Sequence, residues 1–145
     1  MANEVDSACK QMIQYVRTLR GIREAPDYAP EEIGNYPFAL AYPGGGVMDF
    51  GPANDRKGLH TLTLELHIAR KDLSNDVKKA APFVDSIPNL LMYKLQNDNQ
   101  WNGTISTFQR ISYTFGSLGW NQIETFGVRF RVEEVKIQTA ITAPA

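Results

Sequence analysis

The chain has 145 residues, of which 43% are hydrophobic, and its 15 basic and 16 acidic side chains give a net charge of -1. This composition is typical of one soluble globular domain over residues 1–145, and the near-neutral charge gives no electrostatic basis for tight nucleic-acid binding. Because Cys9 is the only cysteine and no apolar run approaches the roughly 20 residues of a bilayer span, we expect an intracellular protein without a disulfide, a leader or a membrane segment.

The first expected element is a helix that Asn3 caps. Its apolar residues recur every three or four positions and form one stripe: Val5, Cys9, Met12, Val16 and Leu19. Because Cys9 lies on this stripe, we interpret it as a small buried hydrophobic residue rather than a reactive thiol. Gly21 ends the helix, and residues 22–35, which contain two prolines, are expected to form an extended connector.

A glycine run separates two short apolar segments. Residues 36–43 and Val47–Phe50 have the composition of short strands, and Gly44, Gly45 and Gly46 between them are interpreted as the flexible tip of a hairpin. Glycine-rich segments can also wrap a phosphate, but this run lacks the Gly-Lys-Ser/Thr ending and a following helix, which favours the hairpin. Residues 51–58 predict a further turn or loop.

The clearest pattern follows between residues 58 and 72. Apolar residues alternate with polar ones: Leu62, Leu64, Leu66 and Ile68 on one side of a strand, and Thr61, Thr63, Glu65 and His67 on the other. We therefore expect a long strand with one buried face. The polar face is expected to meet solvent, a lumen or a neighbouring subunit.

A second helix is expected to begin at Asp72 or Ser74. Its apolar side consists of Ala80, Phe83, Val84, Ile87, Leu90, Leu91 and Leu95. Pro82 and Pro88 lie inside this pattern, and each removes a backbone donor, so the helix should be kinked or split. Residues 97–103 predict a polar loop that carries an isolated Trp101.

Two strands, over residues 104–115 and 124–137, end the domain and are joined by residues 116–123. The apolar phase of the last strand shifts at Glu133 and Glu134, which indicates a β-bulge. The order of elements predicts an α+β fold: a mostly antiparallel sheet packed with an N-terminal helix and a second, proline-kinked helix. The tail from about residue 139 is expected to be flexible or to pair with a partner.

No pattern predicts catalysis or a cofactor. His60 and His67 are seven residues apart on one strand, so they point to opposite faces and cannot share a metal ion. The chain also lacks an Asp/Asn loop with calcium-hand spacing and a serine in a Gly-x-Ser-x-Gly elbow. We therefore expect no catalytic residues, no metal site and no enzymatic activity.

Charged and aromatic residues near the end of the chain have two interpretations. Arg129 and Arg131 share the polar face of the last strand, which is either a solvated face or a contact surface for a neighbouring subunit or for nucleic acid in a channel. Trp120 lies on a glycine-flanked segment, where it can anchor a subunit contact or fold back over its own sheet.

The segments NYPFALAYPGGG, KGLHTLTLELHIARKDLSNDV and ISYTFGSLGWNQIETFGVRFRVEEVKI resemble tail terminator (tail completion) proteins of long-tailed bacteriophages. The resemblance covers about two thirds of the chain. None of the three segments contains a catalytic motif, so the resemblance concerns the fold. It implies a virion protein, made in the host cytoplasm, that forms a ring, with six copies expected. The ring would close the head-proximal end of the tail tube, join it to neck and connector proteins, and let DNA pass through its lumen without sequence-specific binding.

The residues expected at subunit contacts are Gly44, Gly45, Gly46, Met48, Phe50, Trp120, Arg129 and Arg131. One alternative is a head-tail connector adaptor or a minor tail protein. An alternative from another class is a small-ligand-binding or enzymatic α+β domain that uses the open sheet as a cleft.

Overall fold

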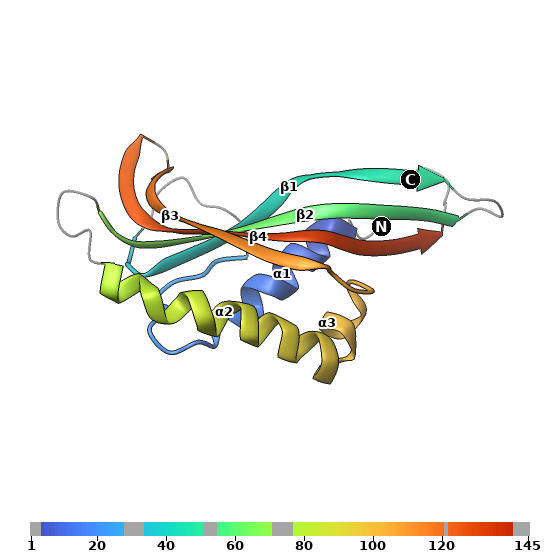
Figure 1. The fold of residues 1–145 in the computed structure, drawn as a ribbon, viewed down its shortest axis with the longest axis horizontal. Coiled ribbons are helices and arrows are strands. Elements are labelled where there is room, and N and C mark those ends of the chain that lie inside the picture. The colour runs from blue at the N-terminus through green and yellow to red at the C-terminus, as the bar shows by residue number, and fades with distance from the viewer. Residues whose placement is uncertain (1–3, 28–33, 51–54, 71–76, 121, 141–145) are drawn as a thin grey trace.

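A computed structural model describes residues 4–27, 34–50, 55–70, 77–120 and 122–140. The elements are α1 (Glu4–Arg17), β1 (Phe38–Phe50), β2 (Asp55–Arg70), α2 (Val77–Asn97), α3 (Asn99–Gly103), β3 (Arg110–Trp120) and β4 (Ile123–Ala140). The strands form one sheet in the order β1-β2-β4-β3, and every neighbouring pair is antiparallel. Figure 1 shows α1 and α2 on the same side of this sheet. The predicted α+β fold is therefore confirmed.

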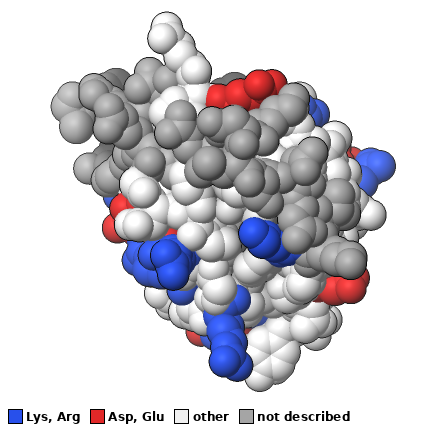
Figure 2. Space-filling model, turned by 90° about the vertical axis from the view of Figure 1, so that its left-hand side faces the viewer, with Lys and Arg blue, Asp and Glu red and all other residues white. Residues whose placement is uncertain are grey.

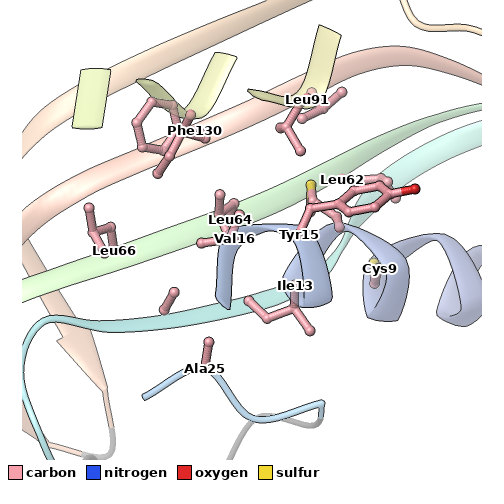
Figure 3. Close-up of a cluster of buried hydrophobic side chains, with 14 of the residues drawn as sticks. Cys9, Ile13, Tyr15, Val16, Ala25, Leu62, Leu64, Leu66, Leu91 and Phe130 are labelled. Atoms are coloured by element: carbon pink, nitrogen blue, oxygen red, sulfur yellow. The ribbon is translucent and has the colours of Figure 1, made fainter. Parts of the chain in front are cut away.

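The main core lies between the helices and the sheet. Alternation places Leu62, Leu64 and Leu66 of β2 on the helix side, where all three are fully buried. The predicted stripe of α1 packs against them, and Figure 3 shows side chains of α1, α2, β2 and β4 meeting in this layer. Cys9 is buried among them, as predicted. The caps predicted at Asn3, Asp72 and Ser74 lie outside the described residues.

α2 is one continuous helix of 21 residues that contains both Pro82 and Pro88, so of the two expected outcomes, a kink or a split, the split does not occur. A proline inside a helix removes one backbone hydrogen bond. The apolar side of α2 offsets this loss, because Ala80, Ile87 and Leu91 are fully buried against the rest of the core.

The predicted polar loop after α2 is a tight turn with an unusual backbone. Residues 99–102 all have positive φ, between 49° and 56°, and therefore form a left-handed turn. Trp101 within this turn is fully buried, and its indole Nε1 donates a 3.0 Å hydrogen bond to the carbonyl oxygen of Leu91. The ring also contacts Tyr15 and Phe108. Burial of this large side chain stabilises a backbone that is otherwise disfavoured.

β1 is a single strand of 13 residues, so the predicted hairpin of two short strands is wrong. Gly44, Gly45 and Gly46 lie inside β1, and the register against β2 shifts between Pro43 and Gly45. This shift is a β-bulge, in which Gly45 adopts a φ of 119°. A Cβ atom on Gly46 would lie 2.7 Å from the carbonyl oxygen of Leu59, so this glycine permits a close strand contact rather than a turn.

The bulge predicted at Glu133 and Glu134 is confirmed. Between the pairs formed by His60 and Leu62, β4 contains two residues where β2 contains one, and Glu134 has a φ of 55°. The extra residue brings Val135 back to the helix side, where it is fully buried.

The last two strands differ from the prediction: β3 begins at Arg110 rather than at residue 104 and ends later than residue 115, and β4 extends beyond the predicted range at both ends. Residues 116–120 were expected in a turn, but they end β3, and Trp120 pairs with Ile123 of β4. β4 runs to Ala140, and the backbones of Thr139 and Ala140 pair with β2, so the tail expected from about residue 139 starts no earlier than 141. Residues from 141 onward lie outside the described part of the chain.

Candidate functional site

Five polar side chains meet on the side of the sheet opposite the helices, and we call them the polar network: Tyr42, Glu65, His67, Thr125 and Arg129. The Tyr42 hydroxyl donates to Oε2 of Glu65, and Nε and Nη2 of Arg129 donate to the same oxygen at 3.2 and 3.1 Å. Oε1 of Glu65 lies 3.0 Å from Nε2 of His67. Nδ1 of His67 lies 2.5 Å from the Thr125 hydroxyl oxygen. The contacts therefore join β1, β2 and β4 through one carboxylate and one imidazole.

A bend in the β3–β4 hairpin covers the polar network. Gly116 pairs with Gly127 at the bend, and a Cβ atom on Gly127 would lie 1.9 Å from the carbonyl oxygen of Leu66. A side chain at position 127 would prevent so close an approach, whereas Gly116 has open space around its Cβ position and a φ of 141° that favours glycine. Beyond the bend the hairpin curls toward the side opposite the helices (Figure 1), and the Leu118 side chain lies over Gly127.

The expected wet face of β2 is therefore wrong. Glu65 is 2% exposed and His67 is fully buried, although both lie on the polar side of the alternation. Phe38 and Leu40 of β1 share this side and are also fully buried, and the Phe38 ring packs edge-on against His67 with ring centres 6.5 Å apart. The sheet thus has a second, smaller core, which surrounds the polar network with apolar side chains.

The network keeps Glu65 ionised. Burial alone would raise the pKa of this carboxyl group, but hydrogen bonds from His67 and Tyr42, with the charges of His67 and Arg129, lower the pKa below its usual value. Burial and the contact with Glu65 raise the pKa of Tyr42 to about 12. Tyr42 consequently remains a hydrogen-bond donor to a charged acceptor.

The Thr125–His67–Glu65 arrangement resembles a nucleophile with its base and orienting acid, but it is closed to substrates. Thr125 and His67 are both fully buried, and the Thr125 hydroxyl also donates to the carbonyl oxygen of Leu118. A catalytic nucleophile must reach a substrate carbonyl or phosphorus. We therefore interpret the polar network as structural.

The other candidates for chemistry are also separated or buried. His60 borders α1 on the helix side, opposite His67, and no group of three metal-ligating side chains occurs in the described ranges. Burial, followed by the negative charge of Asp6, raises the pKa of Cys9 to about 12, so its thiol is unreactive near neutral pH. Within the same ranges, no helix combines the length and apolarity needed to span a bilayer.

An open groove of about 440 Å³ lies between the N-terminal turn of α1 and the second half of β1. It is lined by Val5, Asp6, Pro43, Gly45, Gly46, Met48 and His60. The His60 ring lies over Gly46, close to where a Cβ atom would be. The glycines therefore leave this part of β1 without side chains. Met48 is 45% exposed at the groove. The groove therefore offers an apolar, accessible surface on the helix side of a sheet edge.

The outer edges of the sheet are long and nearly uncharged. β3 has 11 residues with Arg110 as its only charged side chain, and β1 has 13 residues with Asp49 as its only one. The connector covers only the start of β1, where the amide of Ala39 donates to the carbonyl of Glu24 at 2.9 Å. Beyond that contact, no strand in the described ranges pairs with the outer side of either edge.

Large apolar side chains are exposed along both edges. Val47 and Met48 of β1 are 62% and 45% exposed, and Leu59 lies beside Val47 on β2. Tyr113 and Phe115 of β3 are also exposed and contact each other with ring centres 5.7 Å apart. Apart from Met48, sequence reasoning missed these residues. The signal that could have identified β3 was its length without charge, which is unusual for an unprotected edge.

The residues expected at subunit contacts fall into different environments. Gly44, Gly45, Gly46 and Met48 are exposed in β1, and Arg131 is exposed on β4. Phe50 ends β1, and its side chain is not among those described. Arg129 is bound to Glu65 in the polar network, and Trp120 is half-buried at the end of β3. The set is therefore not one surface: of its members, Gly45, Gly46 and Met48 lie together at the groove.

Surface charge is mixed on the end of the molecule where the β3–β4 hairpin lies. Figure 2 shows Lys and Arg there in separate groups with Asp and Glu around them, rather than one continuous basic patch.

No family model matches the chain, and no curated protein has a significantly similar sequence.

Proposed function

We propose that this protein is a structural virion subunit whose copies form a ring that closes the head-proximal end of a phage tail tube and joins it to the neck. The ring has six copies in this proposal, following the resemblance of the sequence to tail terminator proteins. The observation that carries the proposal is the pair of long, nearly uncharged sheet edges, β1 and β3.

An unprotected edge presents a row of backbone donors and acceptors that another strand can pair with. Proteins usually protect such edges with charged side chains, prolines or a covering segment. Here Pro43 is one such device in β1, and among the described residues the connector covers only the start of that strand. The remaining edges, with exposed Val47, Met48, Tyr113 and Phe115, favour a protein whose edges are covered by neighbouring copies.

The two edges also differ from each other, which favours a ring over a symmetric dimer. A two-fold dimer joins one surface to the same surface of its partner, whereas a contact between two different surfaces repeats head to tail and closes when the rotation allows it. β1 has a glycine bulge and a groove, and β3 has an aromatic pair. Two dissimilar edges on opposite sides of one sheet suit the head-to-tail arrangement.

The proposed lumen carries DNA without binding it tightly. The net charge of -1 and the mixed surface charge support passage rather than retention, because strong binding depends on many basic side chains. Arg131 is one exposed basic residue on the side opposite the helices.

Tube capping is the direct test of the proposed function. The purified protein is mixed with growing tail tubes assembled from the tube protein encoded in the same genome, and tube lengths and ends are recorded by electron microscopy. We expect a ring at one end of each tube and an end to elongation from that side. Tubes that elongate at an unchanged rate and bear no additional density at either end would contradict the proposal.

Two alternatives predict different partners. A head-tail connector adaptor or minor tail protein would form a ring but bind connector or tip components rather than the tube end. A ligand-binding or enzymatic domain would instead use the groove at His60 as a monomer. Binding of a metabolite by a monomer, lost on changing His60, would favour this last alternative.

A further inference from the structure

The two outer strands of the sheet have the relative direction needed to continue the sheet from one copy to the next. β1 is antiparallel to β2, β2 to β4 and β4 to β3, so β1 and β3 run in opposite directions. If β3 of one copy lies beside β1 of the next, the new pair is also antiparallel. A rotation about a ring axis repeats this contact without reversing any strand.

The exposed aromatic pair and the groove lie on the same side of such a continued sheet. Tyr113 and Phe115 pair with Phe130 and Val128, whose side chains belong to the core on the helix side. The groove is also on the helix side, because Val5 of α1 lines it. A neighbour's aromatic pair would therefore face the groove rather than the opposite side of the sheet.

The covered start of β1 determines where the neighbour can pair. In register across one copy, Phe115 is level with Ala39 and Tyr113 is level with Ala41. Because Glu24 already bonds to Ala39, an incoming β3 must shift toward the end of β1. Closed sheets generally have such a stagger between strands. The shift moves the aromatic pair from the level of Ala39 toward the groove.

We propose that Tyr113 and Phe115 of one copy seat in the groove beside Gly46 and Met48 of the next copy. This contact rests on the proposed ring function, and it specifies which surfaces meet. In this contact, the two aromatic rings lie against the backbone of Gly46 and against the side chain of Met48. A methionine thioether packs favourably against the edge of an aromatic ring. Bulky aromatic anchors in a pocket typically dominate the affinity of an interface.

Cross-linking between two variants that each carry one introduced cysteine tests this contact. Met48→Cys protein and Phe115→Cys protein are prepared separately, mixed and treated with a short bismaleimide. The native Cys9 is buried and does not react in the folded protein. We expect a covalent dimer in the mixture that is several-fold more abundant than in either variant alone, because the contact joins β1 of one copy to β3 of another.

Neighbouring positions on the opposite side of the same strands provide matched controls. Val47 adjoins Met48 and Thr114 adjoins Phe115, and alternation directs both to the side opposite the helices. Mixing Met48→Cys with Thr114→Cys, or Val47→Cys with Phe115→Cys, should give at least five-fold less cross-linked dimer. Equal yields from matched and control mixtures would overturn the proposed seating.

The experiments test the proposed contact and the proposed ring separately. Rings in electron micrographs without cross-linking between positions 48 and 115 would overturn the contact and leave the ring. Cross-linking between these positions without rings would support the contact and overturn the ring. Monomers without cross-linking would overturn both.

A pair of substitutions adds a measurement that does not depend on reagent access. Replacing Tyr113 and Phe115 together with alanine should weaken self-association at least ten-fold, whereas Thr114→Ala should leave it unchanged. The melting temperature of dilute monomer is measured for both variants, so that a loss of folding is separated from a loss of contact. Unchanged association of the folded double variant would overturn the proposal.

Discussion

Each face of the sheet contains a buried core, and the two cores differ in chemistry. On the helix side, Leu64 is fully buried among apolar side chains of α1, α2 and β4. On the other side, its neighbour Glu65 is almost as buried, yet it is held by Tyr42, His67 and Arg129. One face depends on apolar burial, and the other on a hydrogen-bonded network that the bent hairpin covers.

This comparison indicates where association can occur. The part of each face that is already packed, whether by helices or by the hairpin, has little surface to offer a partner. Among the exposed large apolar side chains, Val47, Met48, Tyr113 and Phe115 lie along β1 and β3, at the two sides of the sheet, while Leu59 lies on β2 beside Val47 and Met92 and Tyr93 lie on α2. In the proposed ring, the copies meet through these two edges.

Removing a side chain from either face should be costly. Glu65→Ala leaves the buried His67 and the half-buried Tyr42 and Arg129 without their acceptor, and we expect a loss of about 3 kcal/mol in the free energy of unfolding. Leu64→Ala should cost about 2–5 kcal/mol through the cavity it creates. Urea denaturation measures both. A loss below about 1 kcal/mol for Glu65→Ala would contradict the structural role of the polar network.

The bend that covers the network should depend on Gly127. A Cβ atom there would overlap the carbonyl of Leu66, so Gly127→Ala is expected to destabilise the protein by about 3 kcal/mol or more. Gly116→Ala is the matched control, because no atom lies within 4 Å of its Cβ position and only its φ of 141° is unfavourable. It should cost about 1–2 kcal/mol. Equal losses would show that the close approach at Gly127 is not what limits substitution.

The two faces should also differ in their dependence on pH. The pKa of Glu65 is lower in the folded protein than its usual value of 4.5, so in acid the unfolded chain binds a proton first. The stabilisation is therefore complete above pH 4.5 and is lost as pH falls through the lower folded pKa. Glu65→Gln should flatten this part of the stability profile, whereas Leu64→Ala should shift the whole profile down without changing its slope.

The smallest expected effect is a gain in stability at the bulge of β4. Glu134 has a φ of 55°, which costs a side-chain-bearing residue more than glycine. Its ion pair with Arg110 is exposed and contributes little. Glu134→Gly should therefore stabilise the protein by up to about 1 kcal/mol, and Glu134→Val should destabilise it. Thermal unfolding distinguishes the two, and a loss of stability for Glu134→Gly would contradict the strain at this position.

The helix-side face could be predicted from the sequence because the pattern that identifies it lies within single strands and helices. The alternation of Leu62, Leu64 and Leu66 identifies one face of a strand, and a phase shift within a single strand identified the bulge at Glu133. The burial of Glu65 could not be predicted in this way, since the hairpin that covers it lies more than 50 residues later, a separation shown by the contact of His67 with Thr125.

The structure of the glycine segments was difficult to predict for a different reason. The run at Gly44 can form a turn or a bulge, and the Cβ contacts that favour the bulge depend on β2 beside it. The same holds for Gly116, whose role depends on its pairing with Gly127. The candidate edges required the order of strands in the sheet, which a single sequence does not specify.

The mass distribution of the wild-type protein, measured by native mass spectrometry over a range of concentrations, tests the central claim most directly. If copies join β1 to β3 head to tail in a closed ring, the spectrum should contain one discrete oligomer, with six copies expected, and no larger series. Monomers at every concentration, dimers only, or an unbounded series of oligomers would contradict the claim.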